Sequence, residues 1–399
     1  MSAREVHIGL LFHSFASENL GVGAFTVANA AIIGKAIEKH GGSPVFHIIG
    51  MRGGKDYSDT CAWQNDFTNV GLKALINPAS DLHKVIKQCD AFFDVGAGDS
   101  FTDIYGPKRF SQMVGAKVLA ARTGKPLIFS PQTIGPFSTS WGKAGAMMTL
   151  GRASKIFARD EMSLKALEGF GVQDQSELTT DLAFVLPFER SANKQPEALS
   201  EGGLEVGLNV SGLLFAMSDT NDGRIRLKLN YADFTRKVIE RLIADPKVAR
   251  VHIVPHVLVP RMPEDDDGAA SKILAAEYPD LVMAPDFASP SEAKSYIASL
   301  DLLLGARMHA TIAALSSDTA VLPLAYSRKF NGLYGSLGYP YLVDMVNEDE
   351  AAALAELDRV MASLPEVAKA AAKSNALAQA KLQTYLDYVD RFAEDMLGQ

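Results

Sequence analysis

Apolar runs alternate with amphipathic stretches along the first half of the chain. Short runs rich in β-branched and aromatic residues predict buried strands, and apolar residues spaced three and four apart predict helices. Strands that alternate with helices are typical of a parallel sheet covered by helices on both faces. The predicted strands are 6–12, 44–49, 90–95, 126–130 and 155–158, and the predicted helices are 24–40, 111–123, 141–153 and 162–169.

The same alternation restarts after residues 187–203, a polar segment rich in Ser, Glu, Lys and Pro that predicts a linker. We therefore expect an α/β protein with two Rossmann-like domains, residues 1–188 and 204–348, facing a cleft. A helical tail, 349–399, follows. Clefts between domains are common ligand sites. The strands predicted for the second domain are 205–210, 249–254, 281–283, 300–304 and 320–324, and its helices are 231–243, 269–277, 289–299 and 311–315.

Composition narrows the classes of function. The chain has 399 residues, of which 47% are hydrophobic, enough for two ordinary cores. Its net charge of −8 argues against nucleic acid or an acidic membrane as a bulk partner, because both favour a basic face. Cys61 and Cys89 have no zinc-site spacing, and no metal is expected. The apolar N-terminal stretch is short and broken by His13, so we expect a cytoplasmic protein without a signal peptide.

The stretch Gly305–Ala310 joins a predicted strand, 300–304, to a predicted helix, 311–315. Arg307 and His309 therefore stand where a strand ends and a helix begins. Ligands bind at the carboxyl ends of strands in open α/β sheets, and helix N-termini favour anions. A permanent cation and an imidazole at this point indicate an anionic substrate and a proton transfer. The alternative is an Arg–carboxylate pair beside a structural histidine.

Two glycine-containing turns follow strands in the first half. In Asn19–Gly23 the first two glycines of a dinucleotide-binding fingerprint are present, but Thr26 stands where the third is needed. The turn Gly96–Asp103 could hold an anion or a sugar through backbone N–H groups. Asp99 and Asp103 could accept hydrogen bonds from a sugar, or they could cap and turn the next element.

Further charged residues stand at the ends of predicted elements. Arg159 ends a strand and suits a carboxylate or phosphate, although a salt bridge is the alternative. Asp160 is interpreted as the N-cap of the next helix. Arg328 and Lys329 follow another strand and could border the same cleft. The acidic run 264–267 lacks calcium-loop spacing and predicts a solvated loop.

Taken in order, these motifs resemble those of the polysaccharide pyruvyl transferase family over about residues 6–345. The chain departs from the family pattern at Val22, where an acidic residue is common, and at Asp99, where a third glycine is common. The motifs that carry the resemblance are Asn19-Leu20-Gly21, Gly96-Ala97-Gly98 with Asp103, Gln132-Thr133-Ile134-Gly135-Pro136, Ala158-Arg159-Asp160 with Ser163, Asp181-Leu182-Ala183-Phe184, Gly305-Ala306-Arg307-Met308-His309 and Tyr326-Ser327-Arg328-Lys329.

The resemblance implies a GT-B-like enzyme that moves a pyruvyl group from phosphoenolpyruvate to sugar hydroxyls, forming a ketal and releasing phosphate. It implies no cofactor beyond phosphoenolpyruvate as co-substrate, and no metal. The acceptor is a sugar or a lipid-linked oligosaccharide, which is compatible with peripheral membrane association through the substrate. Arg307 and His309 are the implied catalytic residues, with His309 as general acid. The implied donor-binding residues are Arg159, Arg307, Met308, His309 and Lys329, and the implied acceptor-binding residues are Asn19, Gly98, Asp99 and Asp103.

Three other functions fit parts of the sequence. A nucleotide-sugar glycosyltransferase of the same fold would also need an anion site at a helix start in the second half. A sugar- or anion-binding protein without catalysis could share the two-domain plan. A nicotinamide dehydrogenase fits less well, because the glycine fingerprint is incomplete. The base that would deprotonate the sugar hydroxyl has three candidates, Asp99, Asp103 and Glu18.

Overall fold

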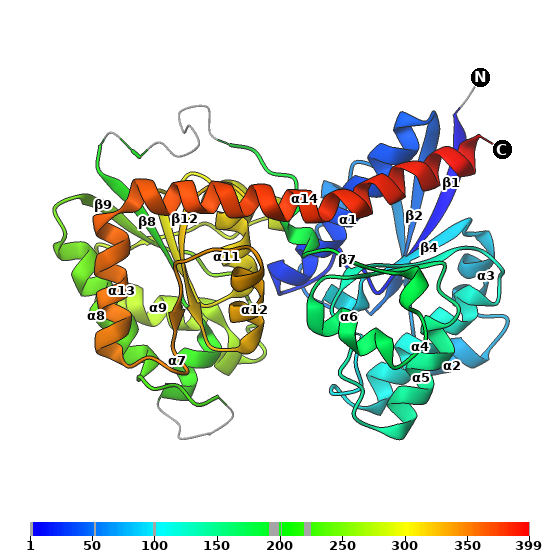
Figure 1. Cartoon of the computed structure of the whole chain (residues 1–399), viewed down its shortest axis with the longest axis horizontal. Coiled ribbons are helices and arrows are strands. Elements are labelled where there is room, and N and C mark those ends of the chain that lie inside the picture. Colours follow the sequence, from blue (N-terminus) through cyan, green and yellow to red (C-terminus); the bar gives the residue numbers. More distant parts are fainter. Residues whose placement is uncertain are drawn as a thin grey trace. The chain divides into compact units, whose positions relative to one another are not determined.

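The computed structural model describes residues 3–51, 53–98, 101–190, 199–200, 202–218 and 225–398. The chain forms two compact units (Figure 1). Unit 1 comprises Met1–Ser17, Val22–Leu182 and Ala380–Gln399, and unit 2 comprises Glu18–Gly21 and Ala183–Gln379. Each unit therefore uses more than one stretch of the chain. The middle of the predicted linker, 191–198, lies outside the described residues.

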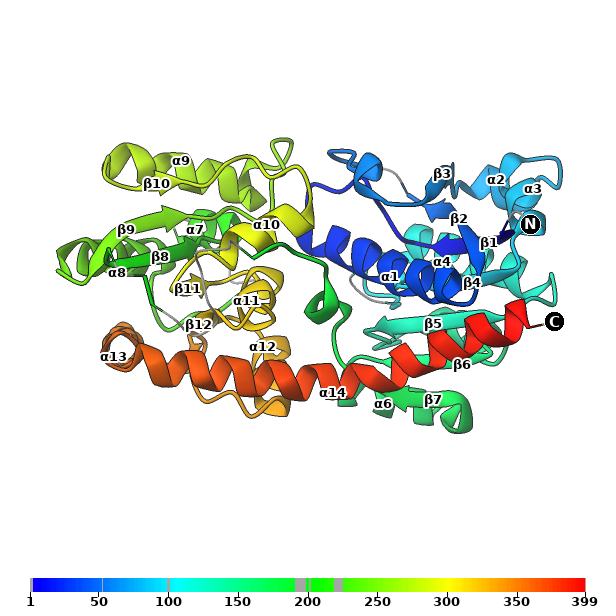
Figure 2. The same ribbon diagram turned by 90° about the horizontal axis from the view of Figure 1, so that it is seen from above.

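Unit 1 is built on a parallel sheet of seven strands in the order β3-β2-β1-β4-β5-β6-β7, which can be followed in Figure 2. The order 3-2-1-4-5-6 is that of a Rossmann sheet, whose ligands bind at the carboxyl ends of the strands where the winding reverses. That point lies between β1 and β4. The strands are β1 (Arg4–Leu11), β2 (Gly42–Gly50), β3 (Gln64–Asn69), β4 (Ala91–Asp94), β5 (Leu127–Gln132), β6 (Lys155–Ala158) and β7 (Ser176–Leu178).

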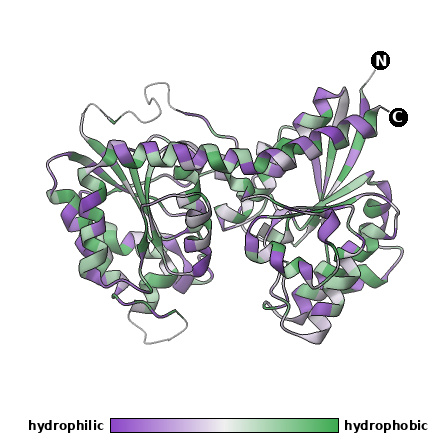
Figure 3. Ribbon diagram, viewed as in Figure 1, coloured by the Kyte–Doolittle hydropathy of each residue, from purple (hydrophilic) through white to green (hydrophobic). Residues whose placement is uncertain are grey.

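Helices cover both faces of this sheet, and successive residues of β4 face them in turn. Phe92 belongs to the hydrophobic core that also contains Phe110 of α4, whereas Phe93 packs on Phe392 of α14. Both faces are therefore apolar, and the central strands are largely green in Figure 3. The helices are α1 (Leu20–Lys39), α2 (Leu72–Ile76), α3 (Asp81–Gln88), α4 (Pro107–Ala121), α5 (Ser140–Leu150) and α6 (Glu161–Glu168), with short 3-10 turns at Ser58–Thr60, Gly96–Gly98, Gln173–Gln175 and Leu182–Val185.

Unit 2 repeats the Rossmann strand order with six parallel strands, β10-β9-β8-β11-β12-β13 (Figure 2). The winding reverses between β8 and β11. All residues of β11 and β12 are buried, as expected for a parallel sheet covered on both faces. The strands are β8 (Leu204–Asn209), β9 (Val248–Ile253), β10 (Val282–Met283), β11 (Leu302–Gly305), β12 (Ala320–Ala325) and β13 (Val343–Asp344).

The helices of unit 2 follow its strands, and the last one contributes to both units. Residues 364–379 of α14 belong to unit 2, and Ala380–Gln399 belong to unit 1. The helices are α7 (Gly212–Ser218), α8 (Tyr231–Ala244), α9 (Asp267–Glu277), α10 (Pro290–Ile297), α11 (Met308–Leu315), α12 (Arg328–Ser336), α13 (Glu350–Ala362) and α14 (Leu364–Leu397), with a 3-10 turn at Pro263–Asp265.

These sheets confirm the predicted α/β class with two Rossmann-like halves and a helical tail. One local prediction is wrong: the glycine-containing stretch after β1 is the first turn of a helix, because α1 already begins at Leu20. This helix is long and apolar enough to cross a membrane, but 72% of its apolar window is buried in the fold, as in a core helix.

A buried ring of hydrogen bonds fastens the end of α14 to unit 1. The Tyr385 hydroxyl donates to Asn29 Oδ1 over 2.5 Å, and Asn29 Nδ2 donates to Ser130 Oγ and to His13 Nε2. Ser130 Oγ and the Tyr385 hydroxyl are 3.0 Å apart. Tyrosine has one hydroxyl hydrogen, so Ser130 donates to Tyr385 and closes the ring. This arrangement fixes which way Asn29 and Tyr385 point.

Candidate active site in unit 2

The site lies where the winding of the unit 2 sheet reverses. Asn209 ends β8, and its side chain joins three strand ends. Its Nδ2 donates to the Val254 carbonyl beyond β9 over 2.8 Å, and its Oδ1 accepts from the Arg307 N–H beyond β11 over 2.9 Å. The backbone that carries Arg307 is therefore held by a side chain from the neighbouring strand.

Arg307 is the N-cap residue of α11, and its guanidinium is paired with two carboxylates. Its Nε and Nη2 donate to Asp267 Oδ1 over 3.0 and 2.7 Å, and Nη2 also donates to Asp265 Oδ1 over 2.7 Å. Burial alone would lower the pKa of Arg307, but these two carboxylates outweigh burial and hold the pKa above its ordinary value. The side chain as a whole is 12% exposed.

Asp267 organises the loops around Arg307. Its side chain is fully buried, and besides Arg307 it accepts the N–H groups of Gly212, His256 and Val257. Burial raises the pKa of Asp267, and Arg307 and these N–H groups oppose the rise. The prediction of a solvated acidic loop is therefore wrong for this residue. The acidic run before the helix does not indicate that Asp267 has a partner, because that partner, Arg307, follows a different strand.

His309 is the second residue of α11, beyond the carboxyl end of β11. Gly21 closes in on its ring: a Cβ atom on Gly21 would overlap His309 Nδ1 and lie 2.5 Å from Cγ. Only glycine leaves room for an imidazole this close to the backbone. Residues Met308, His309 and Ala310 form the first turn of the helix, whose N–H groups have no acceptor within the helix itself.

The segment Glu18–Gly21 belongs to unit 2 although the chain on both sides of it belongs to unit 1. The Leu20 N–H donates to the His256 carbonyl over 3.2 Å, and the Leu258 N–H donates to the Glu18 carbonyl over 2.8 Å. The Glu18 carboxylate also pairs with Arg261. These bonds place Asn19, an implied acceptor-binding residue, in the same unit as His309.

His256 is a buried histidine beside the site that the sequence analysis missed. Burial lowers its pKa to about 3, and the charges of His309 and Arg307 act in the same direction. Its Nδ1 is buried and has no hydrogen-bond partner among the residues that the structure describes. The strand-end rule that selected His309 would also have selected His256, which follows β9.

The remaining implied donor residues lie at strand ends. Met308 is the first residue of α11, and Lys329 is an exposed residue in the first turn of α12, after β12. In unit 1, Arg159 follows β6 and pairs with Asp181 over 3.1 Å, with a side chain that is 9% exposed. The predicted N-cap role of Asp160 is confirmed, because its side chain accepts the Ser163 N–H.

The implied acceptor residues of unit 1 surround the turn after β4. Gly98 ends the turn Gly96–Gly98, and Asp99 lies outside the described residues. Asp103 is buried, and its carboxylate accepts hydrogen bonds from the N–H and hydroxyl groups of Ser138 and Thr139. Burial alone would raise the pKa of Asp103, but these bonds outweigh it and lower the pKa. Both carboxylate oxygens thus have partners within unit 1.

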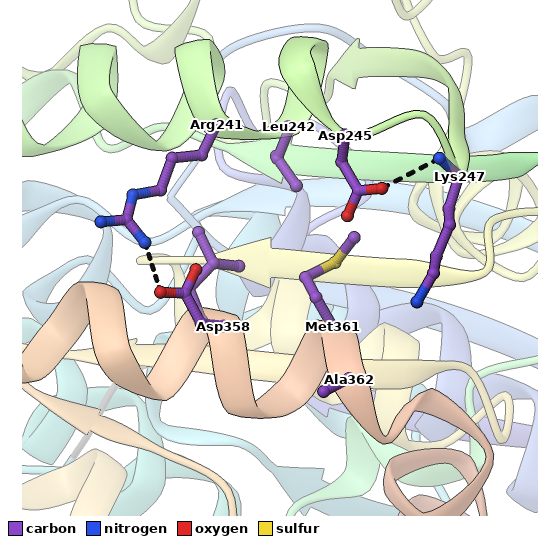
Figure 4. Close-up of a pocket in the computed structure, with 8 residues that line it drawn as sticks. Arg241, Leu242, Asp245, Lys247, Asp358, Met361 and Ala362 are labelled. Carbon is purple, nitrogen blue, oxygen red and sulfur yellow. Dashed lines mark hydrogen bonds and ion pairs between the residues drawn. The ribbon is translucent and has the colours of Figure 1, made fainter.

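A separate pocket of about 210 Å³ lies between α8 and α13 of unit 2 (Figure 4). Its lining includes Asp245 and Lys247, which precede β9, and the Arg241–Asp358 ion pair. It therefore opens near the amino ends of the strands, away from the edge at which Rossmann sheets bind ligands. Among the described parts of the chain there is no group of three His, Cys, Asp or Glu side chains suited to a metal ion.

The family model described as polysaccharide pyruvyl transferase matches residues 30–328. The amylovoran biosynthesis protein AmsJ of Erwinia amylovora is 22% identical over 320 residues, which cover 77% of this chain and 73% of that protein. HepE of Anabaena, solved with UDP-glucose, is 12% identical, with a TM-score of 0.57 over 98% of this chain and 99% of that one. MurG of Acinetobacter baumannii is 12% identical, with a TM-score of 0.51 over 97% and 99%. At such identities the structural likeness shows a shared GT-B-like fold alone.

Proposed function

The chain belongs to the polysaccharide pyruvyl transferase family and is a transferase of polysaccharide biosynthesis, and from this premise we propose that its donor is phosphoenolpyruvate and that His309 is the general acid. The observation that carries the proposal is the position of His309. It stands in the first turn of α11, two residues from Arg307, at the carboxyl edge of the unit 2 sheet. This is the edge at which such sheets bind anions.

The charges of the site decide which groups bind the donor. Asp265 and Asp267 together outweigh the single charge of Arg307, so Arg307 adds directed N–H groups rather than net positive charge. We infer that Nη1, which takes part in none of the bonds to these carboxylates, meets the donor. The N-terminus of α11 and the exposed Lys329 supply further attraction for carboxylate and phosphate.

The reaction begins with a proton transfer to carbon. Protonated His309 gives its proton to the methylene carbon of phosphoenolpyruvate, and C2 becomes an oxocarbenium-like electrophile. One sugar hydroxyl adds at C2 and gives its proton to a base, which releases it to solvent, and His309 regains a proton from solvent. A second hydroxyl then displaces phosphate, closes the ketal and passes its proton to the departing phosphate. Atoms and charges balance without an oxidant, a reductant or a metal.

The other implied contacts remain predictions of the family resemblance. Arg159 is assigned to the donor, and Asn19, Gly98, Asp99 and Asp103 to the acceptor. Asp103 is the least accessible of those that the structure describes, because its carboxylate already accepts four hydrogen bonds. The base for the sugar hydroxyl is therefore sought first at Asp99 or Glu18.

The test compares His309→Gln with wild type in phosphate release from phosphoenolpyruvate, with a host-derived oligosaccharide as acceptor. Removing a general acid costs about 10²–10⁴-fold in turnover, while donor binding measured by calorimetry changes little. In D2O the wild-type product gains one deuterium in its pyruvyl methyl group. As a control, His83→Gln on α3 keeps turnover within about twofold. Near wild-type turnover in His309→Gln would remove His309 from this role.

A nucleotide-sugar glycosyltransferase remains the rival function, because HepE and MurG share the fold. Thermal shift separates the two functions. Stabilisation by phosphoenolpyruvate, and none by UDP-glucose, agrees with the pyruvyl transfer proposed here. The reverse result would replace it with glycosyl transfer.

A further inference from the structure

One part of unit 1 is strongly basic although the chain as a whole is acidic. Residues 101–152 contain seven Lys and Arg residues and a single acid, Asp103, within a chain of net charge −8. Asp103 is buried, so this stretch exposes no carboxylate. Lys117 is also buried, with its Nζ atom 2.8 Å from Asp94 Oδ1, so it does not contribute to the basic surface. The basic character of the stretch ends at α6, whose start carries Asp160 and Glu161.

Large apolar side chains are exposed among these basic residues. Ile104 and Tyr105 stand in the turn before α4, and Trp141, Met147 and Met148 stand on α5. Each is between 42% and 59% exposed. Since α5 already buries its other side against α4, it carries apolar residues on two faces. A surface helix of a water-soluble enzyme normally places polar residues on its outer face.

The exposed apolar side chains stand on elements that pack against one another. The Asp103 carboxylate accepts bonds from Thr139, the N-cap of α5, and so fixes the turn that carries Ile104 and Tyr105 beside the start of that helix. The Trp141 ring packs edge-on against Phe110 of α4, with centroids 5.4 Å apart. Helices α4 and α5 lie side by side in Figure 1.

We propose that this surface docks on an anionic lipid membrane. Tryptophan and tyrosine favour the boundary between headgroups and acyl chains, and each Lys or Arg beside an anionic membrane adds attraction. Arg109 lies 4.4 Å over the Tyr105 ring, which places a cation directly beside an apolar contact. We define the docking face as Ile104, Tyr105, Trp141, Met147 and Met148 together with the basic residues Lys108, Arg109, Lys143 and Arg152 on or next to α4 and α5.

Charge distinguishes this partner from two others. A symmetric pair of copies would bring the same basic face against itself, which like charges oppose. Nucleic acid would use the basic residues but leave the exposed isoleucine and methionines without a partner. An anionic membrane satisfies both kinds of side chain at once. The inference concerns the surface alone and does not depend on the chemistry proposed for His309.

The test uses the full chain and vesicles of phosphatidylglycerol and phosphatidylcholine, with pure phosphatidylcholine as reference. We expect the protein to float with the anionic vesicles. Its partitioning to the neutral vesicles should be at least tenfold weaker. Raising the salt concentration from 50 to 300 mM should weaken its binding to the anionic vesicles. Lys108→Gln with Lys143→Gln reduces partitioning about 25-fold, since each charge near an anionic surface contributes about fivefold. Met147→Ser with Met148→Ser also reduces it. The matched control, Lys272→Gln with Ile273→Ser on the exposed face of α9, stays within twofold of wild type.

Fluorescence adds a test that does not depend on the charge variants. The chain has two tryptophans, so Trp63→Phe leaves Trp141 as the only one. We expect its emission to shift to the blue on anionic vesicles and to be quenched by brominated lipid. Equal binding to neutral vesicles, an unchanged Trp141 spectrum, or wild-type partitioning of the lysine variant would overturn the proposal. Concentration-dependent self-association that the methionine variant abolishes would assign the face to a second copy instead.

Discussion

Gly21 and His256 lie close to His309, and Asp267 pairs with Arg307 two residues before it, and the sequence pattern predicts none of these contacts. The sequence predicts a turn after the first strand at Gly21 and a solvated loop at Asp267, and it indicates no role for His256. The position of His309 itself could be predicted, because a strand end followed by a helix start is a local pattern. Its neighbours come from other strand ends and from the start of α1. Tertiary packing brings these residues together, and the spacing of residues along the sequence does not predict such contacts between distant elements.

At the residue scale, Gly21→Ala is expected to lower turnover by about two orders of magnitude. A methyl group on Gly21 would overlap His309 Nδ1, so the ring must move, and a displacement of about 1 Å at a catalytic group can cost 10²-fold. Steady-state phosphate release measures the effect. Gly332→Ala is the matched control, because Gly332 is also helical but has open space around it. Equal activities of the two variants would show that the close approach of Gly21 has no catalytic importance.

Among the elements, the central strands and long helices were predictable and the short or edge elements were not. Strands with continuous apolar runs, such as β11 and β12, show their burial directly in the sequence. Strand β3, Gln64–Asn69, lies at a sheet edge and is mostly polar. Its sequence therefore shows neither the apolar alternation of a strand nor the apolar spacing of a helix. Strands β10 and β13 have two residues each. Such strands are defined by their neighbours rather than by their own side chains.

The attachment of α14 to unit 1 can be tested at a single hydroxyl. Tyr385→Phe removes the bonds to Asn29 and Ser130 and leaves buried polar groups unsatisfied, which costs about 1–3 kcal/mol. Tyr388→Phe is the control: both rings pack edge-on against Phe157, and no hydrogen bond involves the Tyr388 hydroxyl among the described residues. We expect faster hydrogen exchange in 380–398 for the first variant only. Matching exchange in both variants would show that the ring packing, not the hydroxyl, holds the helix.

Over the whole molecule, net charge proved a poor guide to local surfaces and to pH response. The negative net charge of the whole chain does not reveal that residues 101–152 are basic. The fold also gives each unit a buried histidine that must stay neutral: His13 in unit 1 and His256 in unit 2. Burial lowers the pKa of each to about 3. Only the structure shows this, because burial depends on all the surrounding elements.

Acid should therefore destabilise both units well above the pH at which most carboxylates titrate. Each histidine binds a proton near pH 6.5 when unfolded and near pH 3 when folded, so its contribution is complete above about pH 7 and declines as the pH falls through this window. The loss at pH 5 is about 2 kcal/mol per histidine. Hydrogen exchange in β1 and β9 reports the two units separately. His13→Gln should reduce the pH dependence of the stability measured by exchange in β1 alone, and His256→Gln should reduce that measured in β9 alone. The control, His83→Gln, should leave the pH dependence in both strands unchanged.

The division of α14 between the units has a consequence for synthesis on the ribosome. Unit 1 includes Ala380–Gln399, which pack on Phe93 and Phe157, so the helical cover of its sheet is incomplete when Leu182 emerges. At about 5–20 residues per second, the missing layer follows roughly 10–40 s later. Unit 2, which ends at Gln379, can close first. During that interval the part of the sheet face that α14 covers stays exposed beside α1, and the first half of the chain is the last to finish folding.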